Sequence, residues 1–145
     1  MRLPGSILQG ILARAALVLL RIYLGVICLL AAWSNLSGEF TSCSTGVLEK
    51  VAPLSNPALL ISVFTGTELL VGLTLVLGLM TRLSATVALL LVVSCMLGKG
   101  EWLGQLLGGH GAFAVIAVAL VVGAGGRTLG LDALLAKRWP RSPLW

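Results

Sequence analysis

Residues 58–80 read ALLISVFTGTELLVGLTLVLGLM, and this stretch decides how the chain folds. It is apolar at both ends and carries one charged side chain, Glu68, near its middle. Because a helix rises 1.5 Å per residue, about 20 apolar residues are enough to cross about 30 Å of hydrocarbon. The stretch therefore predicts a membrane-spanning helix. An ionised carboxylate at that depth costs at least about 2.5–3.5 kcal/mol, so Glu68 should be paired or protonated.

The composition extends this prediction to the whole chain. Of the 145 residues, 58% are hydrophobic and only 10% are charged, with a mean hydropathy of +1.06. A soluble globule of this size needs more polar surface, so we expect one integral membrane domain, residues 1–145, embedded in the lipid bilayer. The net charge of +5 is explained by basic residues at the membrane surface, and we expect no nucleic-acid partner.

Four apolar runs predict an all-α bundle of four transmembrane helices, at about residues 14–33, 58–80, 83–98 and 111–126. Only Thr81-Arg82 separates the second and third runs, which should therefore form an antiparallel hairpin. Residues 34–57 form a long outer loop, with a short helix expected at 46–52 and with Asn56 or Ser55 capping the second span. Residues 6–13 are either a short interfacial helix or a mobile tail, and residues 129–139 predict a short interfacial helix.

The distribution of basic residues predicts the orientation of the bundle. Lys50 and Lys99 fall on one side of the membrane, whereas seven bases fall on the other. By the positive-inside rule, both termini then lie in the cytoplasm. We expect a multi-pass protein of a bacterial-type inner (cytoplasmic) membrane. The seven bases are Arg2, Arg14, Arg82, Arg127, Lys137, Arg138 and Arg141.

Arg21 is the remaining base, and it lies inside the first span. With a 1.5 Å rise, Arg21 lies about 10 Å and Glu68 about 18 Å above the cytoplasmic edge, so we hypothesise a direct or water-mediated contact between them. This intramembrane polar pair either fixes the helix register or lines a polar pocket for a quinone or a proton. Each of the two residues lies on a polar stripe, and the stripes should face each other: Arg14, Arg21, Gly25, Cys28 and Asn35 in the first span, and Ser62, Thr65, Glu68 and Gly72 in the second.

The cysteines and the single histidine are further candidates. Cys28, Cys43 and Cys95 all lie toward the outer side, where a Cys43–Cys95 disulfide would hold the outer loop over the bundle. The alternatives are inert thiols or a redox role. The redox role has only weak support, because the sequence contains no CxxC motif. His110 opens the fourth run and has no second ligand for haem and no ligand cluster for zinc, so we expect no metal site. It is either an interfacial side chain or a hydrogen-bonding group beside a quinone.

Three segments occur in a recognisable order: LLRIYLGVICLLAAWSNL in the first run, ELLVGLTLVLGLMTRLSATVALLL in the second and third, and GGRTLGLDALL after the fourth. Over residues 19–135 they resemble the DoxX/DoxD-like family of small membrane proteins. The resemblance implies a four-helix bundle and, in the best-known branch, a subunit of a thiosulfate:quinone oxidoreductase; other members are associated with thiol or oxidative-stress complexes. The outer loop with Cys43 and the tail ending at Trp145 do not map onto the family. The matching positions are Arg21, Gly25, Glu68, Gly72, Gly78, Thr81-Arg82, Arg127 and Leu131-Asp132.

Two classes of function follow. In the first, the chain is the membrane subunit of a multi-protein oxidoreductase or electron-transfer complex, and Arg21, Glu68 and His110 border a quinone site. The sequence holds no flavin, iron–sulfur or haem motif, so we expect no covalently bound cofactor, a quinone as the candidate ligand, and no catalysis by the chain alone. In the second, it is a non-catalytic accessory subunit that stabilises a larger respiratory or photosynthetic membrane complex. A transporter is less favoured, because the short spans show no broken helix or internal repeat.

Overall fold

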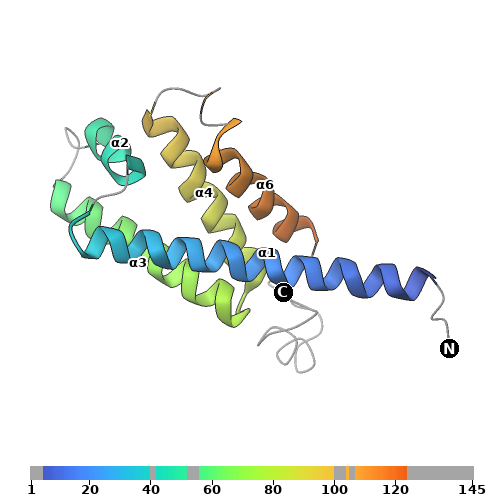
Figure 1. The fold of residues 1–145 in the computed structure, drawn as a ribbon. Coiled ribbons are helices and arrows are strands. Elements are labelled where there is room, and N and C mark those ends of the chain that lie inside the picture. The colour runs from blue at the N-terminus through green and yellow to red at the C-terminus, as the bar shows by residue number, and fades with distance from the viewer. Residues whose placement is uncertain (1–4, 40–41, 52–55, 100–103, 105–106, 124–145) are drawn as a thin grey trace.

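Five helices make up most of the described part of the chain in a computed structural model (Figure 1). The structure describes residues 5–39, 42–51, 56–99, 104 and 107–123. In chain order the helices are α1 (Gly5–Leu36), α2 (Ser42–Val51), α3 (Pro57–Leu77), α4 (Thr81–Lys99) and α6 (Gly109–Val122).

Three helices are long and apolar enough to cross a membrane, over Gln9–Leu36, Ala58–Leu77 and Thr81–Gly98. α6 is also apolar but shorter, with 14 residues. The all-α architecture is thus confirmed, and each of the first three predicted spans corresponds to a helix of spanning length. Leu30, Leu70 and Leu90 remain 59%, 64% and 62% exposed. Such large aliphatic side chains on the outside suit a surface that faces lipid tails, which are as apolar as leucine.

α1 packs along α3 and α4 packs along α6, while further α3–α4 and α1–α6 contacts join the two pairs (Figure 1). Where α1 crosses α3, a Cβ atom at Gly72 would lie 2.9 Å from the carbonyl oxygen of Gly25 and 2.8 Å from Cγ of Leu29. Only glycine lets two helix backbones approach this closely. Gly25 and Gly72, one from each predicted polar stripe, thus meet where the helices cross, whereas Arg14 and Ser62 of the same stripes are exposed. The buried core contains Leu24, Val71, Leu75, Ala85, Ala88, Ala117 and Leu120.

Gly78 ends α3 and starts the turn into α4. Its backbone is left-handed, with φ 67° and ψ 48°. The N–H of Gly78 donates to the carbonyl of Leu75 at 3.2 Å, and the N–H of Leu79 donates to that of Thr74 at 2.9 Å. This pair of bonds is the Schellman motif, which stops a helix and satisfies its last carbonyls. The predicted antiparallel hairpin between the second and third spans is confirmed (Figure 1).

The ends of the helices differ in part from the prediction. α1 begins at Gly5, so residues 6–13 continue the first helix instead of forming a separate interfacial one. At the start of α3, Oδ1 of Asn56 accepts a hydrogen bond from the N–H of Ala58 at 3.1 Å, which confirms Asn56 as the cap. α2 covers residues 46–51 of the short helix expected at 46–52 and begins earlier, at Ser42, whereas Ala52 lies outside the described residues. Ser55 and the helix expected at 129–139 lie outside the described residues.

α2 lies against the C-terminal end of α4. Nζ of Lys50 donates a hydrogen bond to the carbonyl of Leu97, where the negative end of a helix dipole attracts a cation. A Cβ atom at Gly98 would lie 2.8 Å from the carbonyl carbon of Gly46, so the two helix backbones touch. The part of the outer loop that forms α2 is therefore anchored to the bundle.

Candidate functional site

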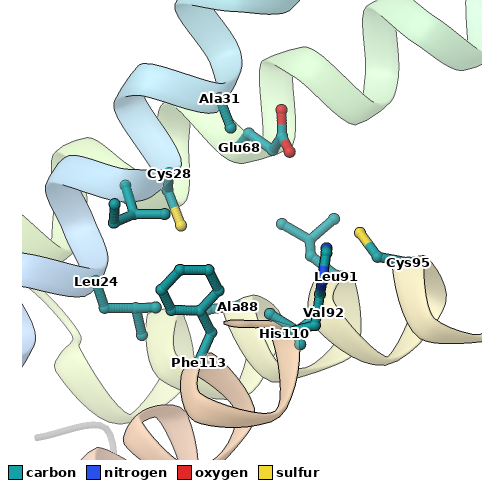
Figure 2. Close-up of a pocket in the computed structure, with 11 residues that line it drawn as sticks. Leu24, Cys28, Ala31, Glu68, Ala88, Leu91, Val92, Cys95, His110 and Phe113 are labelled. Carbon is teal, nitrogen blue, oxygen red and sulfur yellow. The ribbon is translucent and has the colours of Figure 1, made fainter. Parts of the chain in front are cut away.

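A cavity of about 180 Å³ lies between α1, α3, α4 and α6, and we call it the Glu68 cavity (Figure 2). Most of its wall is aliphatic, and the small side chains of Ala31 and Ala88 leave room for it. Figure 2 shows Glu68 across the cavity from His110 and Phe113. Its lining residues are Leu24, Ile27, Cys28, Ala31, Glu68, Ala88, Leu91, Val92, Cys95, His110 and Phe113.

Asn35 holds the carboxyl group of Glu68 in place. Nδ2 of Asn35 donates a hydrogen bond to Oε2 of Glu68 at 2.8 Å. Both residues are buried, with 5% and 7% of their surface exposed. An amide donor satisfies a buried carboxyl oxygen without bringing a second charge into the membrane. The bond also joins the C-terminal end of α1 to α3.

Arg21 lies elsewhere in the bundle. A Cβ atom at Gly78 would lie 2.6 Å from Nη1 of Arg21 and 2.8 Å from its Cζ, so the guanidinium packs against the C-terminal end of α3. Glu68 lies about 15 Å further back along that helix, given a rise of 1.5 Å per residue. The structure therefore does not bring together directly the two side chains that the sequence hypothesis paired. A helix C-terminus attracts cations, which explains the direction that Arg21 takes.

His110 reaches the Glu68 cavity from the first turn of α6. Of the three residues expected to border a quinone site, the structure thus gathers Glu68 and His110 and leaves Arg21 outside. Phe113, one turn further along α6, contributes an aromatic ring to the same wall. Its ring packs against that of Tyr23, with the centroids 6.3 Å apart. This contact ties α6 to α1 beside the cavity.

The cysteines occupy different situations. Cys28 is a free thiol on the cavity wall, and Cys95, which also lines the cavity, is disulfide-bonded. α2, which carries Cys43, packs against α4, which carries Cys95. The side chain of Cys43 lies outside the described residues, so the Cys43–Cys95 pairing stays a prediction. Among the residues that the structure describes, no group of three or more His, Cys, Asp or Glu is placed to hold a metal ion.

Sequence reasoning missed the role of Asn35. The spacing of seven residues in the α1 stripe places Asn35 on the face toward α3, but a depth counted from Met80 does not bring Asn35 and Glu68 together. Measured from the other end, Glu68 lies about 16 Å from Pro57, within reach of the last turns of α1. Asn35 is an uncharged hydrogen-bond donor at that end of α1.

Replacing Asn35 with alanine is expected to destabilise the folded chain by about 1–3 kcal/mol, because Glu68 loses a buried hydrogen-bond donor. Thermal unfolding in detergent, followed by circular dichroism, measures the change. Ser37→Ala is the control, since the hydroxyl of Ser37 donates to the carbonyl of Ser34 at the exposed end of the same helix. That variant should stay within about 0.5 kcal/mol of the native chain. Equal unfolding temperatures for the two variants would contradict the role given to Asn35.

Comparison with known proteins adds one match. A family model described as DoxX matches residues 16–98, which is more than half of the chain and includes α3, most of α1 and all but the last residue of α4. No curated protein and no solved structure matches the chain. The matched residues include Glu68, Asn35, Cys28 and Cys95 of the site, whereas His110 and Phe113 lie beyond the match.

Proposed function

We propose, because this chain belongs to the DoxX family of membrane proteins, that it is the membrane subunit of a multi-protein oxidoreductase and that the Glu68 cavity binds a quinone ring. One observation carries this proposal: Glu68 and His110 both line the same mostly apolar cavity, which lies between apolar helices. Ionisable side chains within a membrane are costly, and they commonly mark ligand or proton sites. The resemblance to quinone-linked members of the family supports the same choice of ligand.

The size and chemistry of the cavity fit one quinone ring. A cavity of about 150 Å³ holds benzene, and the Glu68 cavity measures about 180 Å³. A quinone presents two carbonyl oxygens, which accept hydrogen bonds from an imidazole N–H or a protonated carboxyl group. His110 and Glu68 offer these groups from opposite sides, and Phe113 offers an aromatic face. A bound quinone would supply the acceptor for two electrons and two protons.

In this proposal the residues of the chain position the ring and handle protons, while a partner subunit delivers the electrons. Glu68 holds a proton on its carboxyl group, and Asn35 fixes the orientation of that group through the bond to Oε2. His110 orients one carbonyl oxygen of the ring. We keep the orientation predicted from the basic residues, with both termini in the cytoplasm of a bacterial-type inner membrane. The end of the bundle with Asn35 and His110 then faces the outside.

A binding measurement tests the ligand. Ala31→Leu fills the cavity, and it is expected to weaken binding of a short-chain quinone to the purified protein in lipid nanodiscs at least about tenfold, or ~1.4 kcal/mol. Ala112→Leu is the matched control, because Ala112 is exposed on α6 beside Phe113 and points away from the cavity wall. The control should bind as the native chain does. Equal affinities of both variants, with unfolding temperatures unchanged, would contradict the site.

A second measurement separates a catalytic subunit from an accessory one. The chain is extracted from its native membrane in a mild detergent, and the proteins that migrate with it are identified by mass spectrometry. Within the purified complex, Glu68→Gln should leave assembly intact and lower quinone reduction at least tenfold, because glutamine keeps the hydrogen bonds of the carboxyl group but cannot release a proton. Unchanged quinone reduction in a complex that remains complete would favour the alternative of a structural accessory subunit.

A further inference from the structure

A second recess, of about 320 Å³, lies between the C-terminal end of α1 and the first turns of α3. Its polar wall is formed by Asn35, Ser62 and Thr65, together with the backbone at Gly66. We call it the Thr65 recess. It differs from the Glu68 cavity in position and in composition, since no residue of α4 or α6 lines it.

The hydroxyl group of Thr65 has no hydrogen-bond partner among the described residues, although Thr65 is only 5% exposed. Buried hydroxyl groups in folded proteins are almost always bonded to protein or to ordered water. Ser62 and Thr67 on the same helix satisfy their hydroxyl groups within the helix. These hydroxyls donate to the carbonyls of Ala58 and Val63, four residues back. The Thr65 hydroxyl makes no such bond to a helix carbonyl, and the Thr65 side chain lines the recess.

We propose that the Thr65 recess holds water and connects Glu68 to the side of the membrane at which α1 ends. Asn35 forms the link: it lines the recess and donates to Oε2 of Glu68, which lines the Glu68 cavity. Asn35 therefore borders the recess and at the same time contacts the carboxyl group of Glu68. Thr65 lies three residues before Glu68, so both side chains occupy the same face of α3.

The recess combines the aliphatic side chains of Leu36, Ile61 and Leu69 with the three polar side chains, and the polar group offers partners for water. A water molecule needs two to four polar partners and little room. Here the Thr65 hydroxyl supplies a donor and two lone pairs, and the Ser62 oxygen keeps its lone pairs for incoming donors. The inference holds whether or not a quinone binds in the Glu68 cavity.

Cysteine labelling in native membranes tests the proposal. In a Cys28→Ala background, Gly66→Cys places a thiol in the recess, where an added side chain meets no other atom within 4 Å. The probe is a charged, membrane-impermeant maleimide, which reacts only with thiols that water reaches. Gly66→Cys is expected to react at least ten times faster than Val63→Cys, which is 59% exposed one residue from Ser62 but lies outside the recess. Labelling of the background chain is subtracted.

A reference position fixes the side of the membrane without assuming an orientation. Glu39 lies in the exposed turn after α1, so Glu39→Cys reports the side at which α1 ends. Gly66→Cys should react only when the maleimide is on the side that labels Glu39→Cys. Reaction from the opposite side, or equal rates at Gly66 and Val63, would overturn the proposal, because the thiol would then be reached by another route or by general hydration of the helix.

A final pair of variants tests the hydroxyl group itself. Thr65→Val keeps the volume of the side chain and removes its hydrogen-bonding capacity, whereas Thr65→Ser keeps the hydroxyl. In the Gly66→Cys chain, Thr65→Val should slow labelling severalfold and Thr65→Ser should not. Identical rates in the two variants would show that Thr65 does not hold water there. Thermal unfolding of each variant confirms that the bundle is intact.

Discussion

Gly72→Ala is expected to destabilise the bundle by about 1–3 kcal/mol, the usual cost of overpacking a close contact. The added Cβ atom would lie 2.9 Å from the carbonyl oxygen of Gly25 and 2.8 Å from Cγ of Leu29. Leu29 can rotate, but the Gly25 carbonyl belongs to the backbone of α1 and moves only if the two helices separate. Thermal unfolding in detergent measures the loss, and labelling of Cys28 by a thiol reagent reports any opening between α1 and α3.

Gly66→Ala is the matched control for Gly72→Ala. Gly66 lies in the same helix, and a Cβ atom there meets nothing within 4 Å. Alanine should therefore stabilise α3 at this position by about 0.5–1 kcal/mol, because it lowers the backbone entropy of the unfolded chain. The two substitutions are chemically identical and should have opposite signs. A loss of stability in both, or in neither, would contradict the helix crossing described here.

Gly78→Ala is expected to cost at least about 3 kcal/mol, because two effects add. Alanine in the left-handed conformation costs about 1–2 kcal/mol. The new Cβ atom would also lie 2.6 Å from Nη1 of Arg21, which must then leave its buried place at the end of α3. A buried charge that loses its polar partners destabilises the fold by about 3–5 kcal/mol when it stays buried. The cost is smaller when a long side chain can carry the charge to water. Unfolding by heat in detergent, at fixed lipid content, measures the total.

Gly38→Ala separates the two effects. Gly38 has φ +85°, and nothing lies within 4 Å of its Cβ position. Gly38→Ala therefore introduces backbone strain without a steric clash, and it should lower the free energy of unfolding by about 1–2 kcal/mol. A double variant completes the cycle: Arg21→Met should recover part of the loss in Gly78→Ala, since an uncharged, flexible side chain can move aside. If Gly78→Ala lowers the free energy of unfolding no more than Gly38→Ala does, the contact of Arg21 with Gly78 does not contribute to stability.

The sequence was sufficient for the parts of the fold that depend on long apolar runs and on turn chemistry. Residues 58–80 predicted α3, and the short Thr81-Arg82 separation predicted the hairpin, because lipid admits few alternatives to a continuous helix. The burial of Glu68 inside the bundle, next to a polar partner, also followed, since an acid inside an apolar run must face protein. Asn56 could be chosen as a cap because its side chain accepts from the first free N–H groups of a helix.

The sequence was not sufficient where a long side chain can point either way along its helix. Arg21 and Glu68 were assigned depths that differ by about 8 Å, a distance that an arginine spans. The side chain instead points toward the C-terminal end of α3, where the last carbonyls of that helix attract it. The sequence also left open whether residues 6–13 form a helix or a mobile tail, because Arg14 interrupts the apolar pattern; in the structure they continue α1.

α1 is longer than the membrane is thick. Its 32 residues extend about 48 Å at 1.5 Å per residue, against about 30 Å of hydrocarbon. Its first turns carry exposed side chains from Gln9 to Ala16, and they continue past the other helices (Figure 1). No proline interrupts this helix between Gly5 and Leu36. The protruding end therefore belongs to the same continuous helix as Cys28 and Ala31, which line the Glu68 cavity. A tilt of the protruding end would therefore also shift the cavity wall, because both belong to one unbroken helix.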